Sequence, residues 1–375
     1  MQWEAHASAL AERVTHATSR WRPHVAALPR HLFVPRWWSR TADGWALRDG
    51  PADASRWLEA AYSDTSLVTS VGPLHADHAK SEERPYGLPT SSATLPSLVV
   101  RMFQHARLGD NDVLCDVGTG SGYGAALAAR RLGGHRVTSV DVDPYLTTAA
   151  RERLEAVGLR PALATMDAAA QLPGVYDRIV ATVAVRPIPA SWLAALKPGG
   201  RLVTTIAGTS LLVTAEKDGD GGATGRVEWD RAGFMHTRTG PDYPPRPTEL
   251  LGRARDLEGE EVRTGRYPVV DVAEAWDLAS MLDITAPGIE HHYEARDGRR
   301  LALMAHADGS WARATAHGTE PPTVHQSGPQ RLWDALDDIR DHWLAQGELP
   351  VRGAKVFVKP DGTTYLARGH WVAKL

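Results

Sequence analysis

Hydrophobic and polar positions follow a regular order in the middle of the chain, from about residue 87 to residue 215. Short apolar runs there predict β-strands, and the helical patterns between them predict α-helices. The predicted strands are 112–117, 135–143, 160–167, 176–185 and 201–208, and the predicted helices are 125–131, 145–158 and 189–200. Strands and helices that alternate at this spacing predict an α/β fold with a doubly wound, Rossmann-like parallel sheet.

The two flanks of this region have other patterns. Residues 1–86 begin as a helix and continue as an irregular, tryptophan-rich segment that we expect to pack on the core. A proline-rich stretch at 239–249 predicts a linker. Beyond it, hairpin turns are predicted at 297–298, 308–309 and 361–362, and a helix is predicted at 328–347. We therefore expect an N-terminal segment at 1–86, a core at 87–238 and a C-terminal α+β module at 239–375.

Composition narrows the class of protein. The 375 residues carry a formal net charge of −3, so no basic field indicates binding to nucleic acid. No apolar run is long enough to span a membrane. The single cysteine, Cys115, excludes a disulfide within the chain, and the N-terminal stretch lacks the apolar segment of a signal peptide. We therefore expect a cytoplasmic protein.

Histidines occur in two pairs, His75 with His78 and His291 with His292. Neither pair has a third ligand nearby in the sequence, so we predict no metal site. His75 is instead expected to belong to a loop that contacts the substrate.

A glycine-rich loop follows the first predicted strand of the core. Gly118-Thr119-Gly120-Ser121-Gly122 can bring the backbone close to a ligand. Asp141, followed by Val142, lies 19 residues beyond Gly122, at the end of the second strand. A carboxylate at that position is placed to bind two ribose hydroxyls. Dinucleotides and S-adenosylmethionine both use this geometry.

Three details favour S-adenosylmethionine. Asp116 precedes the loop, where it would repel a pyrophosphate but attract the ammonium of a methionine moiety. Asp167, after Met166, ends the third strand, where it is placed to accept a hydrogen bond from an adenine amino group. The stretch "LAALKPGGRLV" is typical of the late helix, turn and strand of such methyltransferases. We therefore predict a site for S-adenosylmethionine, with S-adenosylhomocysteine as product; a nicotinamide dehydrogenase is the weaker alternative.

Three hydroxyl residues, Thr90, Ser91 and Ser92, stand before a helical apolar stripe. One interpretation is that they cap this helix, which has Pro96 in its first turn. The other is that they contact a substrate. The local sequence supports both.

The chain resembles the protein-L-isoaspartate O-methyltransferases over residues 10–215, notably in "ALPRHLFVP", "AYSD", "TSSA" and "VLCDVGTGSGYGAALAA". The family's active-site serine lies 24 residues before the acid that opens the glycine loop, and Ser92 has this distance from Asp116. The resemblance therefore implies that Ser92 is catalytic, with Thr90 and Ser91 assisting, while Asp64 is a substrate contact or a structural acid. The chain departs from the family pattern at Ser91, which replaces an apolar residue, at Thr94, which replaces a proline, and in insertions at 36–60 and 65–89.

The C-terminal module is absent from the ordinary repair enzymes of this family. With the "TSS" variant and the "VGPLHADHAK" insertion, it resembles a divergent branch associated with lanthipeptide and graspetide biosynthesis. That resemblance implies methylation of an aspartate in a cyclised, ribosomally made precursor peptide. The ester then closes to an aspartimide, which hydrolyses to isoaspartate.

Two other functions stay open. The first is repair of isoaspartyl sites in damaged proteins, and the second is an inactive module that binds a peptide. The C-terminal module is expected either to clamp the peptide or to brace the fold. For the catalytic reading, a carboxylate is already an anion at pH 7, so Ser92 would position it rather than deprotonate it.

Overall fold

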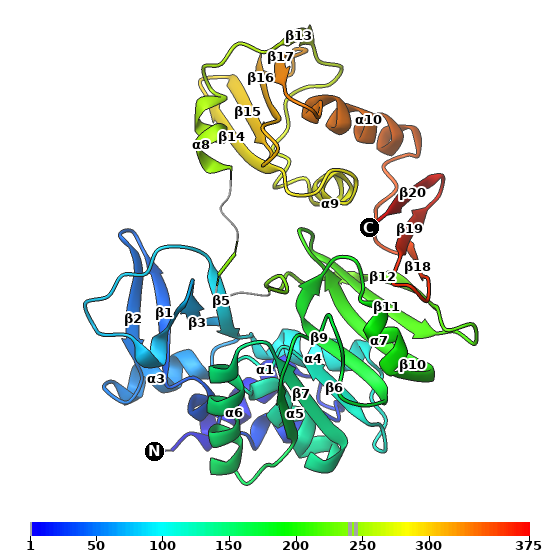
Figure 1. Ribbon diagram of the computed structural model, residues 1–375. Coiled ribbons are helices and arrows are strands. Elements are labelled where there is room, and N and C mark those ends of the chain that lie inside the picture. The colour runs from blue at the N-terminus through cyan, green and yellow to red at the C-terminus, as the bar shows by residue number, and fades with distance from the viewer. Residues whose placement is uncertain (1, 239–241, 244–246) are drawn as a thin grey trace.

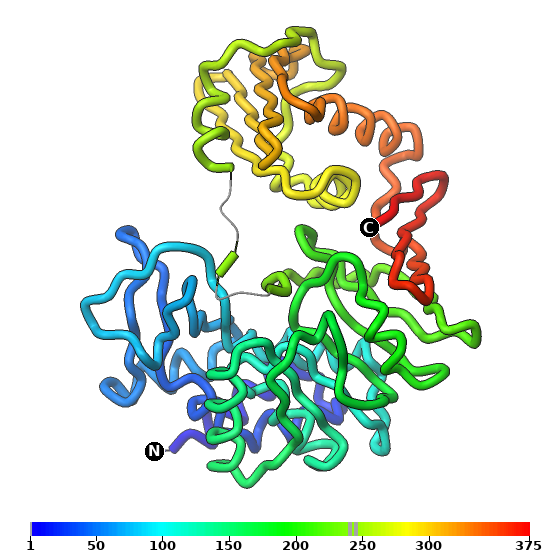
Figure 2. Tube along the Cα trace, viewed as in Figure 1, coloured from blue at the N-terminus to red at the C-terminus, as the bar shows by residue number. Residues whose placement is uncertain are grey.

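The computed structural model describes residues 2–238, 242–243 and 247–375, so the predicted linker at 239–249 lies partly outside the described residues. Figure 1 shows a sheet-based core, a smaller sheet beside it near the N-terminus, and a second sheet with its helices above the core. The chain runs from the core to this upper module and returns at its end to the core (Figure 2).

Five parallel strands form the centre of the core, in the order β8-β7-β6-β9-β10. Their bounds are β6 Leu114–Val117, β7 Val137–Asp141, β8 Ala162–Thr165, β9 Tyr176–Val185 and β10 Leu196–Ile206. The helices between and before them are α4 Pro96–His105, α5 Tyr123–Leu132, α6 Pro144–Ala156 and α7 Ala190–Ala195, which confirms the predicted α/β fold. Strand order reverses between β6 and β9, and ligands bind at such a point in open α/β sheets.

Two hydrophobic cores cover opposite faces of this sheet. Leu114 and Cys115 are neighbours in β6, and both are fully buried, yet each belongs to a different core. Successive side chains of a strand point to opposite faces, so a strand buried on both sides has no alternation of polar residues. This is why Leu114, Cys115 and Val117 of β6 are all apolar; the remaining residue of the strand is the buried Asp116.

Antiparallel strands extend the sheet beyond β10. The hairpin of β11 Leu211–Lys217 and β12 Ala223–Arg231 comes first, and β18 Lys355–Val358, β19 Thr364–Arg368 and β20 Trp371–Lys374 follow. β18 pairs with β12, so the last strands of the chain complete the core sheet (Figure 1). The predicted module at 239–375 thus contributes strands to two sheets, and removing it would uncover the edge of β12.

The upper module is an antiparallel sheet in the order β13-β17-β16-β15-β14. Its strands are β13 Glu261–Thr264, β14 Glu290–Arg296, β15 Arg299–Ala305, β16 Trp311–His317 and β17 Thr323–Ser327, and its helices are α8 Thr248–Arg253, α9 Trp276–Thr285 and α10 Leu332–Ala345. The hairpin turns predicted at 297–298, 308–309 and 361–362 are confirmed by the strands that flank them.

The N-terminal segment differs from its prediction as irregular. After α1 Glu4–Val14, α2 Arg22–Ala26 and the short helix η1 Arg30–Phe33, it forms a sheet in the order β2-β1-β3-β4, with β5 paired to β3. The elements are β1 Arg36–Thr41, β2 Gly44–Asp49, α3 Ala54–Ala61, β3 Leu67–Val71, β4 Leu74–His75, η2 Ala76–His78 and β5 Pro89–Ala93. Trp38 and Trp45 anchor a small core under this sheet, so tryptophans that gave no clear period in the sequence stabilise its strands.

The hydroxyl triplet lies in β5 and does not cap the helix that follows. The amide of Leu95 donates to the Ser66 hydroxyl at 3.0 Å, and the amide of Ser97 donates to the Asp64 carboxylate at 2.9 Å. These two side chains satisfy amides that begin α4 and have no partner within the helix. The capping interpretation of 90–92 is therefore wrong, because a loop about thirty residues earlier supplies the cap.

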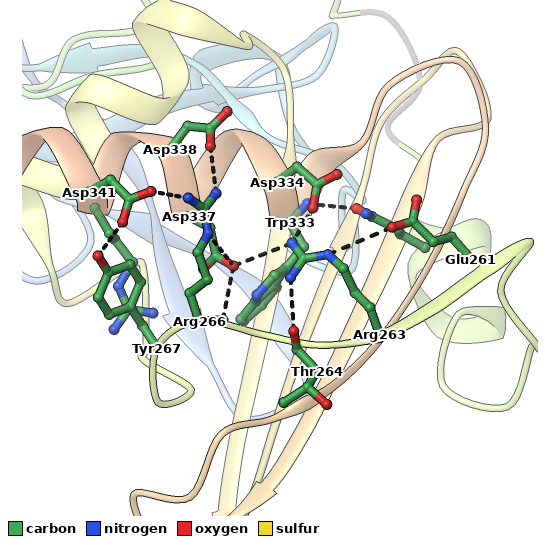
Figure 3. A network of polar contacts seen from close by, with 12 residues as sticks. Glu261, Arg263, Thr264, Arg266, Tyr267, Trp333, Asp334, Asp337, Asp338 and Asp341 are labelled. Carbon is green, nitrogen blue, oxygen red and sulfur yellow. Dashed lines mark hydrogen bonds and ion pairs between the residues drawn. The ribbon is translucent and has the colours of Figure 1, made fainter.

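Figure 3 shows a polar network between α10 and the segment around β13. Four aspartates of α10 accept hydrogen bonds from side chains of that segment; the partners are Asp334, Asp337, Asp338 and Asp341 on one side and Arg263, Arg266 and Tyr267 on the other. Asp337 is fully buried and accepts bonds from the Arg263 guanidinium and the Arg266 amide, each at 3.3 Å. Asp338 pairs with Arg266 but is 72% exposed.

Asp337→Ala should destabilise the upper module by about 1.5–3 kcal/mol, because the Arg263 guanidinium and the Arg266 amide lose a buried, charged hydrogen-bond acceptor. Thermal unfolding, followed by tryptophan fluorescence, measures the effect as a lower melting temperature. Asp338→Ala is the matched control on the same helix. It should lower the free energy of unfolding by less than about 1 kcal/mol, as for exposed ion pairs. Equal melting temperatures for the two variants would contradict this role of Asp337.

Candidate functional site

A cavity of about 300 Å³ lies at the carboxyl ends of β6 and β9, where the strand order of the core reverses. Three walls surround it: the glycine loop after β6, the strand β5, and a segment at 233–238 that follows β12. A cavity with these walls brings together segments from the N-terminal sheet, the parallel strands of the core and the segment that follows β12.

Glycines of the loop are required by backbone conformation and by space. Gly118, Gly120 and Gly122 have φ angles of 96°, 50° and 90°, which side chains rarely adopt. A Cβ atom on Gly118 would lie 2.9 Å from Val183, and one on Gly120 would lie 3.3 Å from the carbonyl oxygen of Ser92. The loop therefore packs directly against the hydroxyl strand β5. Gly122 turns the chain into α5.

Asp116 is the most deeply buried acid of the cavity. It is 1% exposed, and its Oδ2 accepts a hydrogen bond of 2.7 Å from the Ser139 hydroxyl. That hydroxyl also contacts the Thr119 hydroxyl at 2.7 Å, so the acid is tied to the glycine loop. Burial raises the pKa of Asp116 to about 7; the Ser139 bond opposes this shift and the nearby Asp141 adds to it. The carboxyl is therefore poised to ionise when a cation binds beside it.

The other predicted acids lie on the neighbouring strand ends. Asp141 accepts hydrogen bonds from the amides of Gly120 at 2.9 Å and Asp143 at 3.1 Å, and burial raises its pKa. Asp167 is exposed and accepts a bond from the Ala169 amide at 2.9 Å. Nine predicted cofactor residues line the cavity, Gly122 being the exception: Asp116, Gly118, Thr119, Gly120, Ser121, Asp141, Val142, Met166 and Asp167.

The hydroxyl strand forms the second wall. Thr90, Ser91 and Ser92 all line the cavity. Thr90 donates a hydrogen bond of 2.5 Å to the carbonyl oxygen of Gly72, and Ser91 accepts one of 3.0 Å from Thr69. Ser92 is half-buried, and no hydrogen bond of its hydroxyl occurs within the described part of the chain. The Ser92 hydroxyl is thus available to a ligand both as a donor and as an acceptor.

Two predicted substrate contacts lie away from the cavity lining. Asp64 caps α4. His75 is buried in β4, its ring centroid lies 4.8 Å from that of Tyr145, and its Nδ1 accepts a bond from the Asp77 amide at 3.1 Å. Burial lowers the pKa of His75 to about 4, so the ring is neutral at pH 7. The geometry gives both residues structural positions and does not bring them together with the hydroxyl triplet.

The third wall, at 233–238, carries no motif in the sequence. The Ala184 amide donates to the carbonyl oxygen of Met235 at 2.8 Å, and the Thr237 amide donates to that of Ala184 at 2.9 Å, so this segment runs beside the end of β9. Arg238 pairs with Asp143 at 3.5 Å and is 11% exposed. Only the long-range contact with β9 makes these residues part of the site, and only the apolar Phe234 and Met235 hinted at burial in the sequence.

The insertion at 65–89 is connected to the glycine loop through α6. Asp77 accepts a bond of 2.5 Å from Arg153 and one of 2.7 Å from the Tyr145 hydroxyl, both on α6. Arg153 also donates to the carbonyl oxygen of Ser121 at 3.4 Å. The inserted segment therefore supports the loop as well as the hydroxyl strand.

No helix of the described residues is both long and apolar enough to cross a membrane. The same part of the chain contains no group of three or more His, Cys, Asp or Glu side chains arranged to hold a metal ion.

Comparison with known proteins gives a consistent family. Residues 58–230 match the family described as protein-L-isoaspartate(D-aspartate) O-methyltransferase. The chain is 34% identical over 184 residues to the protein-L-isoaspartate O-methyltransferase of Ignicoccus hospitalis, covering 48% of this chain and 69% of that one. It is 27% identical over 247 residues to protein-L-isoaspartate O-methyltransferase 2 of Archaeoglobus fulgidus, covering 64% of this chain and 95% of that one.

A solved structure named protein-L-isoaspartate O-methyltransferase shares the fold, with a TM-score of 0.52 and 17% identity. The match covers 100% of this chain and 99% of that chain. The structural match therefore extends over the full length of both chains. The C-terminal module lies outside residues 58–230, which match the family model.

Binding of S-adenosylhomocysteine should weaken by up to about tenfold per pH unit below pH 7, because Asp116 must lose its proton before it attracts the ligand's ammonium. Affinity should level off above about pH 8, where the carboxylate is ionised in the free protein. Titration calorimetry across this range measures the slope. Asp116→Asn should bind weakly and without this pH dependence, whereas a wild-type affinity that stays constant down to about pH 5.5 would refute the assignment.

Proposed function

The chain belongs to the protein-L-isoaspartate O-methyltransferase family, and from that premise we propose that it methylates a side-chain carboxylate of a peptide, with S-adenosylmethionine as methyl donor. One observation carries the proposal: the half-buried Ser92 hydroxyl shares a cavity with a glycine loop that packs against its own strand. A carboxylate held by Ser92 would lie close to whatever the loop binds.

The residues of the loop wall fit the methyl donor. Asp116 would hold the ammonium group, Asp141 the ribose hydroxyls and Asp167 the adenine amino group. A buried carboxylate directly before the loop disfavours a pyrophosphate there. When bound, S-adenosylmethionine supplies a methyl group, whose carbon–sulfur bond breaks with its electron pair staying on sulfur as the carboxylate oxygen takes the carbon.

Catalysis by the chain itself is a matter of position. The substrate carboxylate is ionised at pH 7, so no side chain has to remove a proton. The Ser92 hydroxyl would donate to one carboxylate oxygen and leave the other aimed at the methyl group. Fixing the geometry of two reactants in this way removes a large entropic part of the barrier.

For the substrate, we propose an aspartate in a cyclised, ribosomally made precursor peptide. Support comes from the wall that carries the triplet, because the insertion at 65–89 supplies β3, which pairs with β5, and the hydrogen-bond partners of Thr90 and Ser91. Ser91 also stands where the family pattern has an apolar residue. After methylation, attack of the next backbone nitrogen on the ester closes the five-membered aspartimide and releases methanol.

A second candidate is repair of isoaspartyl sites in proteins. The relatives that match this chain at 34% and 27% identity are named as protein-L-isoaspartate O-methyltransferases. An inactive peptide-binding module is disfavoured, because Asp116, Asp141 and Ser92 all face one cavity.

Incubation with S-adenosylmethionine and two peptides separates the candidates. One peptide is a cyclised precursor that contains aspartate, and the other is a linear peptide with an isoaspartyl residue. Mass spectrometry should detect a methyl ester, or the aspartimide formed from it, on the precursor. Methylation of the isoaspartyl peptide alone would establish the repair function instead.

Ser92→Ala should lower kcat/KM for the methylated peptide by roughly 10–100-fold, because one hydrogen bond to a charged group is lost. The melting temperature should change little, since the backbone pairing of Ser92 with Val68 persists. Calorimetry with S-adenosylhomocysteine is the control and should give the wild-type affinity. A variant that melts much earlier but retains full activity when folded would show that Ser92 is only structural.

A further inference from the structure

Two β-bulges flank Ser91 in the pairing of β3 with β5. Val68 pairs with Ser92 and Ser70 pairs with Ser91, so Thr69 is an extra residue on β3. Val71 then pairs with Pro89, so Thr90 is an extra residue on β5. Bulges beside an active site redirect side chains that a regular ladder would point elsewhere.

The first bulge directs the Thr69 hydroxyl to Ser91. Thr69 is 1% exposed and Ser91 is 4% exposed, and the Thr69 hydroxyl donates to the Ser91 hydroxyl at 3.0 Å. Two buried hydroxyls are costly to remove from water unless they form hydrogen bonds. The presence of Ser91 where the family pattern has an apolar residue, together with its buried partner Thr69, therefore calls for a role.

The hydroxyl hydrogen of Ser91 is the one in this pair of hydroxyls that has no acceptor among the described residues. Ser91 accepts from Thr69, so its own O–H is free to donate, and no acceptor for it occurs among the described residues. Ser91 lines the cavity, and its hydroxyl oxygen would lie 4.0 Å from a Cβ atom on Gly120. The donor therefore lies beside the glycine loop, at the junction of the two proposed binding regions.

We propose that Ser91 is a second hydroxyl donor to the substrate carboxylate and that Thr69 is the residue that positions it. The inference rests on the proposed function, in which Ser92 is the first donor. Because successive side chains of a strand point to opposite faces, the two hydroxyls would reach the carboxylate from different sides, and its two oxygens offer enough lone pairs to accept both bonds. No proton moves in the step, so both serines keep theirs.

Thr69 acts through Ser91 and does not reach the substrate. By occupying the acceptor side of the Ser91 oxygen, it favours the rotamer in which the Ser91 proton points into the cavity. A donor that is itself a hydrogen-bond acceptor is also polarised, which strengthens the bond that it donates. Two donors restrict the rotation of the carboxylate more strongly than a single donor does. Removing one of them should therefore affect kcat as well as KM.

The test uses the full-length enzyme and whichever peptide the wild type methylates. Ser91→Ala should lower kcat/KM for that peptide by about tenfold or more, with the affinity for S-adenosylhomocysteine unchanged. Thr69→Val, which keeps the size of the side chain, should lower it by roughly three- to tenfold. In the double variant, Thr69→Val should add no further loss, because its effect passes through Ser91.

Ser70→Ala is the matched control, since Ser70 is a buried hydroxyl residue of the same strand that lies outside the cavity lining. It should leave kcat/KM unchanged. Ser91→Cys provides a second variant of similar size, with a weaker donor, in case Ser91→Ala does not fold.

Three outcomes overturn the inference. Ser91 is only a spacer if its variants keep kcat/KM within about twofold of the wild type. It serves the methyl donor if the affinity for S-adenosylhomocysteine falls instead. Thr69 has an independent structural role if its effect adds fully to that of Ser91→Ala. A wild-type enzyme that methylates neither peptide refutes the proposed function itself, which these three outcomes leave intact.

Discussion

The arrangement of the site depends on the buried guanidinium of Arg30. Arg30 is 0% exposed and donates hydrogen bonds to five backbone carbonyl oxygens; they belong to Ala61, Ser63, Thr65, Ala93 and Thr94. Its guanidinium also lies 5.4 Å from the centre of the Tyr123 ring, at the start of α5. Burial lowers the pKa of Arg30, and the charge of Asp64 opposes the shift. One cation thus joins the loop that caps α4, the end of the hydroxyl strand and the helix behind the glycine loop.

A second arginine completes this support from the other side. Arg153 bonds Asp77 of the inserted segment, the carbonyl oxygen of Phe33 and that of Ser121 in the glycine loop. Arg30 holds the end of β5 and Arg153 holds the segment after β4 against the core. The cavity lies where β5 meets the glycine loop. The segment at 233–238 closes the cavity from the third side. The upper module contacts the core nearby, where Asp283 of α9 pairs with Arg186 at 3.0 Å just after β9.

A feature could be predicted from the sequence where its interactions join residues that lie close together along the chain. The core strands, the glycine loop and Asp116, Asp141 and Asp167 are local patterns at fixed spacing, and they could be predicted. The cap of α4 joins residues 33 positions apart, and β18 pairs with a strand more than 120 residues earlier, so neither leaves a local signal. Tryptophan-rich β1 and β2 lack the alternation that marks a strand, because Trp37 and Trp38 are both buried. The position of His75 in the inserted loop predicts a substrate contact, whereas its burial against Tyr145 depends on tertiary packing.

Residues that follow the family pattern and residues that depart from it lie on different walls of the cavity. The loop and its acids follow the family pattern, and the contacts of Arg30 and Arg153 with backbone carbonyls depend little on the side chains around them. The residues that depart from the pattern, Ser91 and the segment at 65–89, surround the hydroxyl strand. In the proposed function, retaining the glycine loop and its acids while altering the hydroxyl strand and its surroundings would change which carboxylate the enzyme can position, and would leave the reaction the same. The second hydroxyl and its bulged threonine are therefore the features through which a different peptide would be selected.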